Sequence, residues 1–143
     1  FKSKNITLSR PDFMTVLINK SSTLGGKKWH YDDVDVINFI IMIKGEGTHI
    51  LHNNNIFQLT PGYGYITIGI EGYNFMGMKP TLHKAPETDE NRLILKVILD
   101  GDFNFEKYCF GPNICGYETP LYNERRNNIQ QMLEEDLNIV KNL

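Results

Sequence analysis

The chain has 143 residues, of which 41% are hydrophobic and 22% are charged, and its formal net charge is -2. This length suffices for one domain with a sizeable core, and the near-neutral charge argues against phosphate-driven nucleic-acid binding by this segment alone. No apolar run approaches the roughly 20 residues of a membrane-spanning helix, and two cysteines are too few for a disulfide framework. We therefore expect a cytoplasmic protein with reduced thiols.

Short apolar runs separated by Gly, Asn and Pro predict a mainly β fold, because each breaker ends a run before a helical face can form. After an extended arm over 1–11, we predict strands at 12–18, 36–43, 48–52, 56–59, 63–68, 73–78 and 93–99. The Gly- and Ser-rich segment 19–28 and the polar segment 79–91 are predicted loops. Three consecutive asparagines, Asn53 to Asn55, predict a hairpin turn, because asparagine tolerates positive φ.

The strand predicted at 36–43 is apolar on both faces except at Asn38, which favours a strand covered on both sides. A buried amide must find hydrogen-bond partners. Asn38 is therefore expected either to bond with neighbouring backbone or to face a ligand.

The end of the chain changes period. Apolar residues recur at three- and four-residue steps, which predicts an amphipathic helix over 123–143 after an irregular connection over 104–122. The stripe on this helix could form a dimer contact or pack against the chain's own barrel: Ile129, Leu133, Leu137 and Val140. The whole chain, 1–143, is expected to be a single domain whose β-barrel spans 12–103.

Two tight turns carry a resemblance to a known family. A strand is followed by Lys44-Gly45-Glu46-Gly47-Thr48-His49, then by Leu59-Thr60-Pro61-Gly62 and an Ile-rich strand. This pattern resembles the cupin-type, arabinose-sensor-like amino-terminal domain of AraC-family transcription regulators. The resemblance implies a cupin-like double-stranded β-helix, or jelly roll, with a C-terminal helix. It also implies that a helix-turn-helix DNA-binding domain is missing from this chain.

Cupin enzymes usually bind a metal through an H-x-H pair, a Glu four residues later and a His after the Pro-Gly turn. Counting from the two turns places Asp32, Val34, Asn38 and Tyr73 at those positions. Valine cannot ligate a metal, and asparagine and tyrosine are poor substitutes. The resemblance therefore implies a barrel without metal or cofactor.

The chain has four histidines. His49 and His52 lie on opposite faces of one predicted strand, so they cannot hold one ion together. We interpret them, together with His30 and His83, as surface histidines or as histidines with satisfied hydrogen bonds. The resemblance also allows His30 to face the pocket, because a sugar-gripping arginine occupies the matching position in the family.

The resemblance also assigns pocket positions. Tyr73, Phe75, Leu95 and Val97 match residues that bind the sugar in the family. Phe, Leu and Val cannot satisfy sugar hydroxyls, so we expect a more apolar small-molecule effector. The expected ligand-binding set is Trp29, His30, Asp32, Asn38, Tyr73, Phe75, Leu95 and Val97. The alternative is that these side chains simply fill the barrel core.

These observations predict a metal-free effector-sensing and dimerisation domain of an AraC-family regulator, without enzymatic activity and without a membrane partner. In this role the effector would shift the packing of the arm and the closing helix, and so the geometry of a homodimer. The alternative function is a metal-independent cupin enzyme of the sugar-nucleotide epimerase or isomerase type, with His30 or a tyrosine as acid or base.

Overall fold

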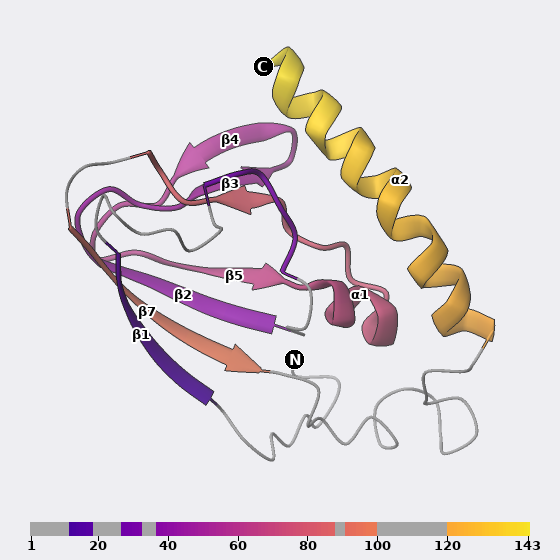
Figure 1. Cartoon of the computed structure of the whole chain (residues 1–143), viewed down its shortest axis with the longest axis horizontal. Helices are drawn as coiled ribbons and strands as arrows, with labels where there is room; N and C mark the ends of the chain where they lie inside the picture. The colour runs from indigo at the N-terminus through magenta and orange to yellow at the C-terminus, as the bar shows by residue number, and fades with distance from the viewer. Residues whose placement is uncertain (1–11, 19–26, 33–36, 88–90, 100–119) are drawn as a thin grey trace.

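The computed structural model describes residues 12–18, 27–32, 37–87, 91–99 and 120–143. The predicted arm over 1–11 and most of the predicted connection over 104–122 lie outside this description. Figure 1 shows strands gathered into two sheets with a long helix beside them. The elements are β1 (Asp12–Ile18), β2 (Ile37–Lys44), β3 (His49–His52), β4 (Asn55–Gln58), β5 (Gly64–Ile68), α1 (Ile70–Met76), β6 (His83–Lys84), β7 (Arg92–Leu99) and α2 (Pro120–Asn142).

Both sheets are antiparallel. The larger sheet has the order β1-β7-β2-β5, and the smaller sheet has the order β4-β3-β6. His30 forms an isolated antiparallel bridge to His83 on β6, so the segment before β2 continues the smaller sheet. Strands that alternate between two such sheets form a jelly roll, and the predicted cupin fold with a C-terminal helix is confirmed.

The core lies on the inward face of the larger sheet. Ile40 and Met42 of β2 pack with Ile94 of β7 and with Leu59, and Tyr65 adds to this cluster. Inward and outward residues alternate along each strand. The expectation that β2 is covered on both faces is wrong at its outward positions, because Phe39 is 40% exposed and Ile43 is 47% exposed.

The predicted turns are confirmed. Asn53 and Asn54 have φ of 49° and 61°, as the hairpin between β3 and β4 requires. Gly62 follows Pro61 with a φ of 89°, and its N–H donates to Met42. These two turns fix how β3, β4 and β5 return across the barrel.

One predicted strand is wrong. Residues 73–78 were expected to be extended, but Ile70–Met76 forms the helix α1. Glycine bounds this helix at both ends: Gly69 is extended, and Gly77 adopts a left-handed φ of 70° while its N–H caps the carbonyl of Tyr73. The alternation of Tyr73 and Phe75 resembled a strand, but the flanking glycines set a two-turn helix instead.

The predicted exposed loop over 79–91 is also wrong in part. Leu82 is 1% exposed and His83 is 5% exposed, and His83–Lys84 forms β6 against β3. The polar composition around this strand hid it, because β6 is only two residues long. This short strand is what brings His83 into the barrel.

Helix α2 begins at Pro120, three residues before its predicted start, which fits the preference for proline in the first helical turn. Asp136 on this helix is 2% exposed, while Leu137 is 38% exposed. The stripe containing Ile129, Leu133 and Val140 is half-buried and lies on the side of Asp136. This face packs against the domain itself, and dimerisation through it stays a prediction. No described helix is long and apolar enough to cross a membrane.

Candidate metal centre

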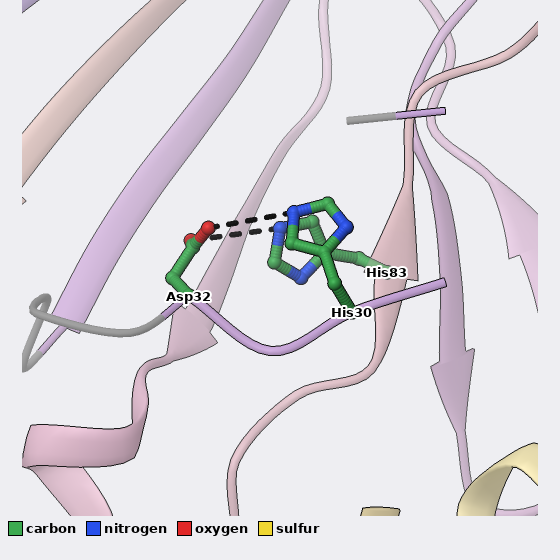
Figure 2. A group of neighbouring side chains, drawn as sticks. All are labelled: His30, Asp32 and His83. Atoms are coloured by element: carbon green, nitrogen blue, oxygen red, sulfur yellow. Dashed lines mark ion pairs between the residues drawn. The ribbon is translucent and has the colours of Figure 1, made fainter. Parts of the chain in front are cut away.

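His30, Asp32 and His83 turn their side chains toward one another, as Figure 2 shows. His30 and Asp32 are two residues apart in extended chain, so both side chains leave the same face. His83 comes from β6, which lies directly beside His30 through the bridge between them. The three side chains therefore come from two neighbouring segments that are about fifty residues apart in the sequence.

The ligand atoms face one another at close range. Nε2 of His30 lies 3.6 Å from Oδ1 of Asp32, and Nε2 of His83 lies 3.5 Å from Oδ2. One nitrogen from each histidine and one carboxylate oxygen all lie within 4.8 Å of one another. Two imidazoles and one carboxylate in such a group are a donor set that can hold a transition-metal ion.

Backbone carbonyls fix the orientation of both imidazoles. Nδ1 of His30 lies 2.7 Å from the carbonyl oxygen of Lys28, and Nδ1 of His83 lies 2.9 Å from that of Thr81. A carbonyl can only accept, so each Nδ1 carries the hydrogen. Both Nε2 atoms therefore face Asp32, and a metal-binding histidine adopts this ring orientation when its other nitrogen donates to a carbonyl.

The carboxylate of Asp32 favours positive charge beside it. Lys96 supplies one such charge at 3.2 Å, and a proton on His30 can supply another. The hydrogen bond to Asp32 raises the pKa of His30 above its ordinary value, by more than burial lowers it. A divalent cation would provide the charge more fully, since all three donors could bind it together.

Two further side chains hold the carboxylate of Asp32. Asn38, which is fully buried, donates from Nδ2 to Oδ2 at 2.8 Å, and Nζ of Lys96 lies 3.2 Å from the same oxygen. Burial would raise the pKa of Asp32, but its contacts with His30, His83 and Lys96 outweigh burial and hold that pKa far below the usual range. Asp32 is therefore an anion over the physiological pH range.

The backbone around the ligands is also anchored. His30 and His83 exchange backbone hydrogen bonds of 3.0 and 3.2 Å. The carbonyl of Asp32 accepts from the N–H of Ile70, the first residue of α1, at 2.8 Å. Rigid secondary structure therefore supports the segments that carry all three donors.

A buried arginine lies elsewhere in the same barrel. Arg92, at the start of β7, is 1% exposed; its Nε donates to the carbonyl of Glu46 and its Nη2 to the hydroxyl of Thr48. Its Nη1 finds no hydrogen-bond partner within the part of the chain that the structure describes. Burial lowers the pKa of Arg92 to about 10, so the group is still a cation at neutral pH.

The structure unites three of the residues predicted to bind a ligand: His30, Asp32 and Asn38. Trp29 is half-buried beside them in the sequence, with Nζ of Lys84 at 5.6 Å from the centre of its ring. Tyr73 and Phe75 belong to α1 and not to a barrel strand, and the side chain of Phe75 lies outside the description.

Leu95 and Val97 occupy outward positions on β7. Ile94 and Lys96 alternate with them and point to the core and to Asp32. Leu95 and Val97 therefore lie on the opposite face of the sheet from the three candidate ligands. Alternation along β7 gives this result directly once Lys96 is known to face inward.

Counting from the Gly and Pro-Gly turns missed the donor set. It assigns the family's four ligand positions to Asp32, Val34, Asn38 and Tyr73 and so predicts no metal, whereas the structure brings His30 and His83 to Asp32. The count assumed H-x-H, whereas this chain has His30-Tyr31-Asp32. That H-x-D step, followed by a later histidine, is the signal that could have found the centre.

Comparisons with known proteins give the fold and no family. No family model and no curated protein matches the chain. Among solved structures, it is similar to the Cupin_2 domain of an XRE-family transcriptional regulator from Enterobacter cloacae, with 15% identity, a TM-score of 0.40, and coverage of 62% of this chain and 79% of that one.

Two further similar structures are longer proteins. A rice dioxygenase for auxin oxidation has 12% identity and a TM-score of 0.48, with coverage of 83% of this chain and 46% of that one. The full-length Neurospora crassa T7H, solved in complex with alpha-KG, has 11% identity and a TM-score of 0.47, with coverage of 87% and 43%. The chain thus spans less than half the length of these two proteins.

Fold and site together define a cupin-type barrel with a possible metal centre. The prediction of a protein without enzymatic activity is contradicted, since the barrel contains His30, Asp32 and His83, a group of donors that could hold a metal ion. The more specific assignment to AraC-type sensors has no support beyond the sequence resemblance.

Proposed function

We propose that this chain is a mononuclear non-haem iron(II) oxygenase domain. The observation that carries the proposal is the convergence of His30, Asp32 and His83, with both Nε2 atoms turned toward the carboxylate. Two histidines and one carboxylate with open coordination positions are typical of non-haem Fe(II) oxygenases. When bound, the iron would supply the redox chemistry that activates dioxygen.

The chain's own residues supply binding and orientation. The carbonyls of Lys28 and Thr81 hold each imidazole with Nε2 toward the centre, and Asn38 holds the carboxylate. The anionic Asp32 offsets one of the two charges of a divalent ion. Only three protein donors converge among the described residues, which leaves positions for small molecules around an octahedral ion.

Arg92 supports a 2-oxo dicarboxylic acid, such as 2-oxoglutarate, as co-substrate. A buried cation whose Nη1 lacks a partner is a suitable anchor for a carboxylate. Its partner Thr48 precedes Ile50 by two residues, and Ile50 pairs with His83. The position of Thr48 thus lies roughly 7 Å along the strand from that of Ile50, which pairs with His83.

The corresponding overall reaction is balanced. One atom of dioxygen enters a C–H bond of the substrate as a hydroxyl group, and the other enters the acid that remains when the 2-oxoacid loses carbon dioxide. Full reduction of dioxygen takes four electrons. The C–H bond of the substrate supplies two, and the oxidative decarboxylation of the 2-oxoacid supplies the other two. For 2-oxoglutarate the products are therefore hydroxylated substrate, succinate and carbon dioxide.

The test is oxygen-dependent formation of succinate from 2-oxoglutarate by the iron-loaded chain. We expect slow turnover without a prime substrate, and none in the His83→Ala variant. Arg92→Met should weaken 2-oxoglutarate binding in anaerobic calorimetry, while Arg125→Met, which removes a guanidinium on α2, should not. A wild-type chain that binds no Fe²⁺ would overturn the proposal, as would stoichiometric binding of zinc with no binding of iron.

The narrower AraC-type sensing function would show as binding of an effector without turnover. It depends on the sequence resemblance alone, whereas homodimerisation through α2 depends on the apolar stripe of that helix, and a cytoplasmic location depends on interpreting the two cysteines as reduced thiols. The same succinate assay separates the two functions, because a sensor domain would consume neither oxygen nor 2-oxoglutarate.

A further inference from the structure

We propose that Asp136 on α2 is a positioning residue for the metal centre and that it acts through Tyr31. This inference depends on the proposed function, since it concerns the geometry of the same three ligands. Tyr31 lies between His30 and Asp32 in the sequence. Its side chain therefore leaves the opposite face of the segment, away from the two ligands that flank it.

That opposite face contacts the C-terminal helix. The hydroxyl of Tyr31 donates to Oδ2 of Asp136 at 2.6 Å, across 105 residues of sequence. Tyr31 is 5% exposed and Asp136 is 2% exposed, so water does not compete for this bond. Burial, together with the neighbouring carboxylate, raises the pKa of Tyr31, and the hydroxyl stays a donor at physiological pH.

Asp136 is itself held in place. Nζ of Lys79 lies 2.6 Å from its Oδ1, so both carboxylate oxygens have a partner. A buried carboxylate in the middle of an amphipathic helix needs a reason, because burying a charge is costly unless it is paired. Its two bonds attach α2, which Figure 1 shows passing alongside α1, to the ligand-bearing segment and to the chain before β6.

The bond to Asp136 completes a three-point support. The backbone of His30 is fixed by β6, and the carbonyl of Asp32 is fixed by the N–H of Ile70. The bond to Asp136 adds a third attachment at Tyr31, between these two points. Losing its anchor would let the two ligands turn relative to each other, and metal binding is sensitive to such outer contacts.

The experiment measures Co²⁺ affinity and the visible Co²⁺ spectrum of the full chain, beside its urea unfolding midpoint. Tyr31→Phe keeps the ring and removes the hydroxyl, and Asp136→Asn keeps the shape and removes the charge. We expect each to weaken Co²⁺ binding about tenfold and to change the ligand-field bands. The double variant should lose no more than either single variant, because both act through one bond.

Arg125→Met is the matched control. Arg125 also attaches α2 to the body of the domain, through a 3.3 Å bond from Nη1 to the carbonyl of Asn74, but it contacts no residue of the segment His30–Asp32. It should lower the unfolding midpoint without changing Co²⁺ affinity. Equal Co²⁺ affinity in Arg125→Met, Tyr31→Phe, Asp136→Asn and wild type would overturn the inference.

Failure of the inference and failure of the proposed function are distinguishable. A wild-type chain that binds no Co²⁺ or Fe²⁺ would refute the metal centre itself. A wild-type chain that binds them, with folded variants that bind equally well, would refute only the positioning by Asp136. If Tyr31→Phe does not fold, Asp136→Asn decides, because it leaves the tyrosine intact and replaces the charged acceptor of the bond by a weaker neutral one.

Discussion

Metal binding should stabilise the chain against heat, and the size of this effect follows from the geometry. Metal–ligand distances of about 2.0–2.1 Å place adjacent donor atoms roughly 2.8–3.0 Å apart around an octahedral ion. Without a metal, Nε2 of His30 lies 3.6 Å from Oδ1 of Asp32 and Nε2 of His83 lies 3.5 Å from Oδ2, and the three donor atoms lie within 4.8 Å of one another. Side-chain rotation can close these gaps, so the folded chain should bind Fe²⁺ and the unfolded chain should bind it poorly.

At a free Fe²⁺ concentration of one hundred times Kd, binding to the folded state alone contributes about 2.7 kcal/mol. For a domain of this size, that corresponds to a rise in Tm of roughly 5–11 °C. The assay is an anaerobic thermal scan by circular dichroism with and without Fe²⁺. Mg²⁺ is the ionic control, since it prefers oxygen ligands and should give a much smaller shift.

Variants assign the shift to the proposed ligands. His83→Ala and Asp32→Asn should abolish it, while His49→Ala should retain it, because His49 lies in β3 outside the group of three donors. A shift of the same size in all three variants would place the ion elsewhere. No shift in the wild-type chain at saturating Fe²⁺ would refute the reasoning.

Three further predictions follow from single contacts. Lys96→Met should tighten Fe²⁺ binding in calorimetry, because Nζ of Lys96 lies 3.2 Å from Asp32 and its positive charge repels the ion. Weaker binding would contradict this prediction. Gly47→Ala should lower the free energy of unfolding measured in urea by about 3 kcal/mol, because the new Cβ would overlap the carbonyl of Leu59. Gly62→Ala is the control: it has open space around it and should lower the same free energy by about 1 kcal/mol, through its positive φ alone. The metal-free chain should be more stable at pH 6 than at pH 8, because the pKa of His30 is raised in the folded state. The stability that this shift contributes is complete below about pH 6.5, the ordinary pKa of histidine, and is lost as the pH rises through the pKa of the folded state. Asp32→Asn should remove the difference between the two pH values.

Much of the barrel could be predicted from local sequence. The asparagines of the β3–β4 turn, the Pro61-Gly62 turn and the apolar strands β2 and β7 each follow from conformational preferences of a few neighbouring residues. The helix α1 and the strand β6 could not be predicted in this way. The ends of α1 depend on Gly69 and Gly77, and β6 exists only because β3 and His30 pair with its two residues.

The same limit explains why the candidate metal centre formed by His30, Asp32 and His83 could not be predicted from the sequence. A count along the chain assigns ligands by distance from turns, but His83 reaches the site through β6, which local sequence does not reveal. His30 and Asp32 were both selected as pocket residues, each as a separate polar group for an organic ligand. The bridge between His30 and His83 places the two histidines side by side. His83, which the sequence places in a loop, therefore joins His30 and Asp32 in one group of converging donors. Since each Nδ1 already donates to a carbonyl, both Nε2 atoms remain directed at Asp32, where they can either donate a proton to its carboxylate or bind a cation together with it.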